Sequence, residues 1–306
     1  MSPERVLTEV DGRELSLSNL DKVLYPDTGF TKSQMLDYYA RIADVMVPHL
    51  RSRPTTFRRY PNGVEGMSFF EKHAPDHQPE WIATIEVPSK QGEHEPIVYT
   101  AVGERATLLW AANLAAIEFH VPLWHVAKGK SIPAPPDYMV FDLDPGPGTT
   151  IVECCRVAQW LGERLDRDSL LAKTSGSKGL QLYTRVQRTT WDQLGARAHD
   201  IARAIERDHP GEVVSMMRKN LRDGKVLIDW SQNNSSKTTV AAYSMRARPE
   251  PTVSTPVSWA EVDKCAKVGK PGMLQFETKD VLKRIDKYGD LMAPLVVGKS
   301  RAKAKS

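Results

Sequence analysis

YMVFDLDPGPG, residues 138–148, is an apolar run that ends in two carboxylates and then in prolines and glycines. The apolar part predicts a strand, and because strand side chains alternate between faces, Asp142 and Asp144 should point the same way. Two neighbouring carboxylates repel each other unless a cation lies between them, and their oxygens suit Mg²⁺ or Mn²⁺. An isolated D-x-D can also be a turn whose aspartates accept hydrogen bonds from loop amides, so this motif alone leaves both interpretations open.

A second predicted strand, residues 225–230, also ends an apolar run with a carboxylate, Asp229. Three carboxylates from two strand ends could hold two metal ions. One ion would lower the pKa of an attacking hydroxyl, and the other would neutralise a leaving pyrophosphate. Asp229 could instead be a surface residue beside Trp230, and sequence spacing does not decide between these alternatives.

The loop between predicted strands 170–174 and 180–186 reads TSGSKG and contains Ser175, Ser177 and Lys178. Small residues let backbone N–H groups approach an anion, while the hydroxyls donate hydrogen bonds and the lysine supplies charge. The loop is not a Walker A motif, and Ser/Gly loops are also common turns. Its position between two strands of the carboxylate region favours a triphosphate cradle.

Four Ser/Thr-x-x-Gln/Glu capping boxes, at Thr31, Thr150, Thr190 and Ser258, each predict the start of a helix. A further helix is expected over residues 106–117, running directly into a strand over residues 118–126. Helices and strands do not alternate strictly, which favours an α+β fold over a doubly wound parallel sheet.

Composition narrows the class of protein only weakly. The chain has 306 residues with 42 Lys+Arg against 38 Asp+Glu, and two basic clusters, near residues 51–59 and 218–225, could be nucleic-acid contacts or solvated faces. The three cysteines have no Cys-x-x-Cys spacing, which argues against a zinc ribbon or a disulfide framework. We find no signal peptide and no membrane-spanning stretch, so we expect a cytoplasmic protein.

The sequence pattern alone does not decide the roles of His120 and of the pair Phe69 and Phe70. His120 should lie on the opposite strand face from Phe119 and Val121, but a lone strand histidine is more often structural than catalytic. Phe69 and Phe70 could form a core pair, or could stack on unpaired bases.

Several ordered strings together resemble the polymerase domain of bacterial DNA ligase D, in the archaeo-eukaryotic primase superfamily, over about residues 15–292. They are SNLDKVLYP, RRYPNGV, SFFEKHAP, IEFHVPLW, VFDLDPG, TSGSKGL, LRDGKVLIDWSQNN and SSKTT. The resemblance implies an α+β primase-polymerase fold with a central mixed or antiparallel sheet flanked by helices. It also implies one catalytic domain over residues 1–294, followed by a basic, disordered tail over residues 295–306.

The resemblance assigns roles to residues of this chain. Asp142, Asp144 and Asp229 match the catalytic metal ligands, for two Mn²⁺ (or Mg²⁺) ions. The positions around the incoming nucleotide are matched by His120, Ser175, Ser177, Lys178, Gln181 and Arg222. Phe69 and Phe70 match aromatics that pack on bases at the break, and Asn19, Lys22 and Lys32 match a 5′-phosphate pocket. The expected anion site also includes the free backbone N–H groups of the helix that begins at Lys32.

One position departs from the family: where its members usually carry histidine, this chain has Gln181, so triphosphate binding should be weaker or differently tuned. If Gln181 lies near the triphosphate, Gln181→His should tighten nucleotide binding through a charge-assisted hydrogen bond. A catalytically weak module that binds DNA ends or gaps is therefore one alternative, and a Mn²⁺-dependent D-x-D nucleotidyl or glycosyl transferase is another.

The expected activity is templated addition of nucleotides, with ribonucleotides preferred over deoxyribonucleotides, at DNA gaps or double-strand-break ends. The protein should act as a monomer on nucleoside triphosphates. Because the resemblance covers a polymerase module alone, we expect a separate DNA ligase to seal the product and Ku to take part in end joining.

Overall fold

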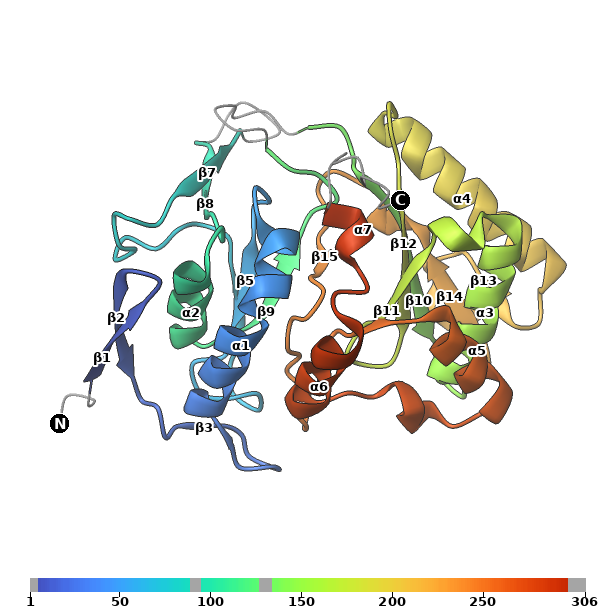
Figure 1. The fold of residues 1–306 in the computed structure, drawn as a ribbon. Coiled ribbons are helices and arrows are strands. Elements are labelled where there is room, and N and C mark those ends of the chain that lie inside the picture. The colour runs from blue at the N-terminus through green and yellow to red at the C-terminus, as the bar shows by residue number, and fades with distance from the viewer. Residues whose placement is uncertain (1–4, 89–94, 127–133, 297–306) are drawn as a thin grey trace, which may run out of the picture.

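The computed structural model describes residues 5–88, 95–126 and 134–296. Two main sheets form the two halves of the molecule (Figure 1). The smaller sheet takes three strands from residues 56–121 and β15 from later in the chain, and the larger takes its strands from residues 138–257. The larger sheet has six strands in the order β13 (Val213–Val214), β14 (Val226–Asp229), β10 (Tyr138–Pro145), β12 (Leu180–Arg185), β11 (Leu171–Thr174) and β16 (Pro256–Val257). Its strand pairs are antiparallel except for the parallel pair β13–β14, which confirms the predicted mixed sheet.

Three helices cover one face of the larger sheet: α3 (Ile151–Arg164), α4 (Trp191–Asp208) and α5 (Trp259–Val268). Phe141 and Leu143 of β10 point into this layer, where they are fully buried with the apolar sides of the helices. Strand alternation therefore turns Asp142 and Asp144 to the opposite face, which packs in part against the core of the other half. The helix layer fixes which face of the sheet can carry chemistry.

The smaller sheet is antiparallel, in the order β15 (Thr239–Val240), β9 (Ala116–Val121), β5 (Thr56–Arg59) and β6 (Phe69–Glu71). It packs in one apolar core with α1 (Lys32–Leu50) and α2 (Arg105–Asn113). Three hairpins lie around this half: β1 (Arg5–Val10) with β2 (Arg13–Ser18), β3 (Val23–Tyr25) with β4 (Phe30–Thr31), and β7 (Thr84–Val87) with β8 (Ile97–Thr100). Short 3₁₀ helices are η1 (Arg167–Ser169), η2 (Lys219–Leu221), η3 (Trp230–Gln232) and η4 (Pro271–Leu274).

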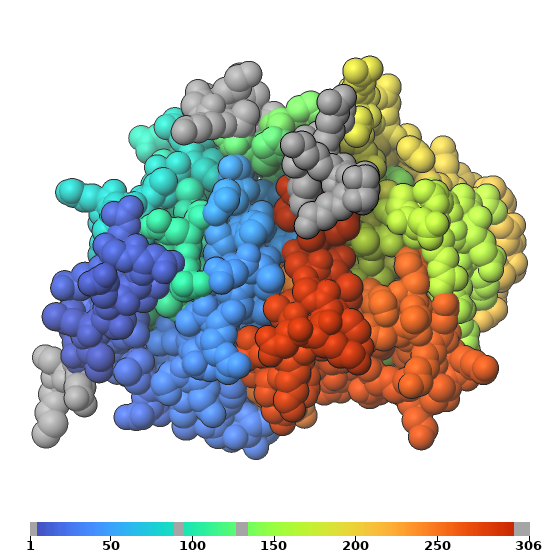
Figure 2. Space-filling view, in the orientation of Figure 1, coloured from blue at the N-terminus to red at the C-terminus, as the bar shows by residue number. Residues whose placement is uncertain are grey.

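The C-terminal helices α6 (Thr278–Tyr288) and α7 (Ala293–Val296) return to α1 and lie between the two halves, as Figure 2 shows in red. Asp290 fixes this return, because its carboxylate contacts His49 Nε2 at 2.9 Å and accepts a hydrogen bond from Tyr243 at 2.6 Å. Leu295 is buried in the core, so the expected domain boundary after residue 294 falls inside α7. The rest of the expected tail, residues 297–306, lies outside the described residues.

All four predicted capping boxes are present, at the starts of α1, α3, α4 and α5. The helix expected over residues 106–117 was too long. It ends at Asn113, because Ala115 adopts a left-handed backbone with φ 61° and Ala116 already opens β9. The strand after it ends at Val121, before Pro122, and not at residue 126. No helix in the described ranges is both long enough and apolar enough to cross a membrane.

Candidate active site

A row of polar residues crosses the face of the larger sheet that lies opposite the three helices. Lys173 of β11 pairs in register with Gln181 of β12, Gln181 pairs with Asp142 of β10, and Asp142 pairs with Asp229 of β14. Directly opposed residues on neighbouring strands have side chains on the same face, about 5 Å apart at Cβ. Asp144 lies two residues beyond Asp142, on the same face. The three predicted carboxylates therefore meet at one place.

Each carboxylate disfavours the ionised form of its neighbours. Burial, followed by the charges of Asp144 and Asp229, raises the pKa of Asp142 to about 7, against a hydrogen bond from Gln181 that lowers it. Burial and the charge of Asp229 also raise the pKa of Asp144. Asp142 Oδ1 is buried and has no hydrogen-bond partner among the described residues. A buried carboxylate oxygen without a partner is costly, and a divalent cation would supply that partner.

The donor set fits a hard cation such as Mg²⁺ or Mn²⁺, which carboxylate oxygens favour. Asp229 is already engaged: its carboxylate accepts hydrogen bonds from Ser231 N at 2.9 Å, Ser231 Oγ at 2.6 Å and Gln232 Nε2 at 2.9 Å. Within the described ranges, no three His, Cys, Asp or Glu side chains form a closed metal cluster. To coordinate an ion together with Asp142 and Asp144, Asp229 would therefore have to give up some of its hydrogen bonds to Ser231 and Gln232.

The loop over residues 175–179 connects β11 to β12 beside the carboxylates. Ser175 Oγ accepts hydrogen bonds from the backbone N–H groups of Ser177 and Gly179, at 3.2 and 3.0 Å, and so shapes the loop from inside. A Cβ on Gly179 would lie 2.3 Å from Leu143 O, so only glycine lets the loop approach β10 this closely. Ser177 and the exposed Lys178 remain on the pocket wall.

One open pocket of about 410 Å³, a volume in the range of small-ligand sites, is lined by all six predicted nucleotide residues. Its walls include His120, Asp142, Asp144, Ser175, Ser177, Lys178, Gln181 and Arg222. Arg222 donates to Met217 O at 2.7 Å, and its charge opposes the rise in the pKa of Asp144. Segments far apart in sequence thus enclose one cavity with carboxylates on its floor and cations on its walls.

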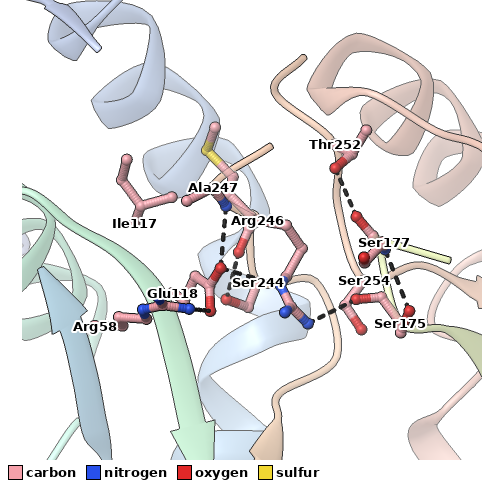
Figure 3. Close-up of polar contacts among 12 residues, drawn as sticks. Arg58, Ile117, Glu118, Ser175, Ser177, Ser244, Arg246, Ala247, Thr252 and Ser254 are labelled. Carbon is pink, nitrogen blue, oxygen red and sulfur yellow. Dashed lines mark hydrogen bonds and ion pairs between the residues drawn. The ribbon is translucent and has the colours of Figure 1, made fainter. Parts of the chain in front are cut away.

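Two further residues of this region, Glu118 and Arg246, were not predicted from the sequence. Figure 3 shows Arg246 between Glu118 of β9 and the loop, with Nε 3.2 Å from Glu118 Oε1 and Nη1 donating to Ser175 O at 2.9 Å. Arg246 and Arg248 also line the pocket. Glu118 lies two residues before His120, so alternation could have placed both on one face, but nothing in the spacing indicated Arg246.

Glu118 is almost fully buried and is held ionised by its partners. Burial alone would raise the pKa of Glu118, but the hydrogen bond from His120 and the charge of Arg246 outweigh it and lower that pKa to about 2. His120 Nε2 lies 2.9 Å from Glu118 Oε2, and burial lowers the pKa of His120 although Glu118 opposes this effect. Glu118 therefore fixes the orientation of both His120 and Arg246.

Phe69 and Phe70 do not form a core pair. They lie on the edge strand β6 with 42% and 56% of their surface exposed, and each ring has a guanidinium over it, from Arg59 and Arg58 respectively, at 5.2 Å. Phe70 also makes an edge contact with His120, 5.7 Å between ring centroids. Exposed rings beside arginines and next to the pocket match the stacking alternative.

The structure also brings Asn19, Lys22 and Lys32 together. Lys22 N donates to Asn19 O at 3.1 Å, Lys32 N donates to Lys22 O at 2.8 Å, and Lys32 Nζ donates to Ser18 O at 2.6 Å. Burial and the charge of Lys22 lower the pKa of Lys32 to about 8. The expectation of free N–H groups at this helix start was wrong, because the amides of residues 32–34 already donate to Lys22 O, Leu20 O and Thr31 Oγ1.

Comparison with known proteins assigns the chain to a family. The model of the LigD primase-polymerase domain family matches residues 31–292, and the chain belongs to that family. It is 42% identical over 283 residues to a multifunctional non-homologous end joining protein LigD of Mycolicibacterium smegmatis, and 30% identical over 280 residues to the bifunctional one of Bacillus subtilis. These alignments cover 91% and 90% of this chain but 36% and 43% of the relatives, so the chain spans less than half of their length.

A solved structure is similar across the whole fold. The polymerase domain of Mycobacterium tuberculosis ligase D, in complex with DNA, matches with a TM-score of 0.84 and 41% identity, over 92% of this chain and 98% of that one. The match confirms the expected fold class and the resemblance drawn from the sequence motifs.

Proposed function

We propose that this protein adds nucleotides, directed by a template strand, to DNA ends at gaps or double-strand breaks. The proposal rests mainly on the environment of Asp142. Its buried Oδ1 has no hydrogen-bond partner among the described residues, and it lies beside two further carboxylates and a loop rich in hydrogen-bond donors. A similar structure was solved with DNA, and the curated relatives are named as non-homologous end joining proteins. Ribonucleotide preference and Mn²⁺ as the favoured ion are part of the proposal through the family resemblance.

Asp142, Asp144 and Asp229 would hold two divalent ions, whose chemistry would lower the pKa of the primer 3′-hydroxyl and neutralise the leaving pyrophosphate. Ser177, Lys178 and Arg246 line the pocket and would bind the triphosphate through donated hydrogen bonds and charge. His120 and Arg222 would contact the nucleotide from the pocket wall.

Two features outside the nucleotide pocket would position the DNA. Phe69 and Phe70 would stack on bases at the break, and Asn19, Lys22 and Lys32 would bind the 5′-phosphate across the gap. We further propose a single catalytic domain that acts as a monomer in the bacterial cytosol, with a separate DNA ligase and with Ku.

Primer extension on a gapped duplex with Mn²⁺, comparing ribonucleotides with deoxyribonucleotides, tests the proposal. Templated addition that is faster with ribonucleotides is the expected result. DNA binding without any addition would favour the non-catalytic alternative, and turnover of a sugar nucleotide would favour the glycosyltransferase.

A further inference from the structure

Lys173 is a buried lysine at one end of the active-site row, and none of the roles assigned above includes it. Burial lowers its pKa to about 7, although the charge of Asp142 opposes this effect. Its side chain is 1% exposed, on the strand β11. Lys173 Nζ donates to Gln181 Oε1 at 2.5 Å and to Ser254 Oγ at 2.8 Å, and it lies 5.5 Å from the centre of the Tyr183 ring. Gln181 lines the nucleotide pocket, whereas Lys173 lies behind it, outside the pocket walls.

The contacts fix which way the carboxamide of Gln181 points. An ammonium group can only donate, and Tyr183 also places its hydroxyl 3.1 Å from the same oxygen, Oε1. Turning the amide over would set its N–H donors against the ammonium, donor against donor. With Oε1 held inward, the amide N–H group is left for the opposite side, where Asp142 is the register partner.

We propose that Lys173 is a positioning residue, which holds the Gln181 carboxamide with its N–H group turned toward Asp142 and the nucleotide pocket. Gln181 then acts as an oriented donor at the place where the family's pattern has histidine. The inference rests on the proposed function, because it concerns nucleotide binding at the same site. It identifies residues 173 and 181 as one functional pair across the strands β11 and β12.

The contact between Lys173 and Gln181 changes the expected effect of Gln181→His on nucleotide binding. In the wild-type background the Lys173 ammonium would repel a protonated imidazole at position 181, so the histidine would stay neutral and accept from Lys173 with one ring nitrogen. Its single N–H group would then replace the two of the amide, and it would bring no positive charge to the triphosphate. Gln181→His should therefore weaken nucleotide binding, opposite to the expectation from the sequence alone. Once Lys173→Met removes the ammonium, the same histidine should be tolerated.

Four proteins test this coupling: wild type, Lys173→Met, Gln181→His and the double variant. Equilibrium binding of Mn²⁺-ATP is measured by calorimetry, and KM and kcat by primer extension. Each single change should raise Kd and KM about tenfold with a smaller effect on kcat, as for loss of one charge-assisted contact. The double variant should return to within about threefold of wild type. Lys264→Met, which removes an exposed lysine on α5, is the control and should bind like wild type.

Wild-type Kd and KM in Lys173→Met, or single effects that simply multiply in the double variant, would overturn the inference. Thermal unfolding of each variant checks that it folds. Should Lys173→Met be unfolded, Lys173→Gln replaces it, and Gln181→His must then cost less in the Lys173→Gln background than in wild type. If wild type binds Mn²⁺-ATP with this coupling but extends no primer, the proposed function fails while the inference stands.

Discussion

Asp142 destabilises the folded protein when no cation is bound. Its pKa is raised from 3.8 to about 7, so the folded state binds a proton that the unfolded state has released, and stability falls as pH rises through that interval. Asp142→Asn should therefore raise the unfolding temperature at pH 8 in EDTA, by about 2–4 °C for each kcal/mol relieved. The same change should abolish nucleotide addition and leave DNA binding largely intact, because phosphate contacts dominate affinity.

Calorimetric melting with and without Mn²⁺ measures the first effect, and primer extension the second. Mn²⁺ should stabilise wild type but not Asp142→Asn. Extension near the wild-type rate in Asp142→Asn would contradict the two-metal mechanism.

Glu118 has the opposite effect on stability. Its pKa is lowered from 4.5 to about 2, so the stabilisation it gives is complete above about pH 4.5 and is lost as pH falls toward 2. The shift corresponds to about 3 kcal/mol at neutral pH. Glu118→Gln should lower the urea-derived free energy of unfolding at pH 7, and the gap to wild type should close near pH 2–3. A gap that stays constant over this range would show that Glu118 acts through packing alone.

At the level of elements, the approach of the phosphate-loop residues 175–179 to β10 depends on Gly179. A methyl group there would meet Leu143 O at 2.3 Å, and backbone cannot yield as a flexible side chain can. Gly179→Ala should cost about 1–3 kcal/mol of stability and raise KM for the nucleotide, since the loop must move away from the carboxylates. Gly272→Ala is the matched control, because nothing lies within 4 Å of that position and its φ is ordinary. Equal melting temperatures for the two variants would contradict the argument.

Local signals in the sequence predicted the local parts of the site. Capping boxes located four helix starts, and two apolar runs ending in aspartate located β10 and β14, because both signals depend on neighbouring residues. The residues that hold the site residues in place come from distant parts of the sequence. Arg246 reaches Glu118 across 128 residues and Ser175 across 71, and Lys173 meets Ser254 across 81. Contacts between loops and strands far apart in the chain bring these groups together, and no spacing in a single sequence encodes those contacts.

On the scale of the whole molecule, the pocket belongs to neither sheet alone. The larger sheet supplies the carboxylates and the smaller supplies His120, which Glu118 orients. Arg246 forms hydrogen bonds to Glu118 on one side and to the loop residue Ser175 on the other. Asp290 ties the C-terminal return to α1 and to Tyr243, and Arg284 of α6 donates to Glu261 of α5, so this return contacts both halves. The nucleotide site therefore depends on the relative position of the halves as well as on its own residues.

The lysine site at the start of α1 allows recognition of a gap to be tested separately from nucleotide addition. Its α1 amides are already hydrogen bonded, so a 5′-phosphate would depend on the ammonium groups of Lys22 and Lys32. A charge-assisted hydrogen bond contributes about 1.5–3 kcal/mol, so a gapped duplex with a 5′-phosphate should bind about tenfold more tightly than one with a 5′-hydroxyl. Because the pKa of Lys32 is lowered to about 8, this preference should shrink as pH rises past 8, and as salt rises.

Lys22→Ala combined with Lys32→Ala should erase the preference for phosphate while leaving extension of an open template–primer nearly unchanged. Fluorescence anisotropy with paired 5′-phosphate and 5′-hydroxyl duplexes measures the preference, and Lys264→Ala, on the exposed side of α5, controls for general loss of positive charge. A double variant that still discriminates by the wild-type margin would place the phosphate site elsewhere. Loss of binding to both duplexes alike would mean that these lysines contact DNA without reading its 5′ end, because a phosphate-specific pocket must change the ratio of the two affinities and not their common value.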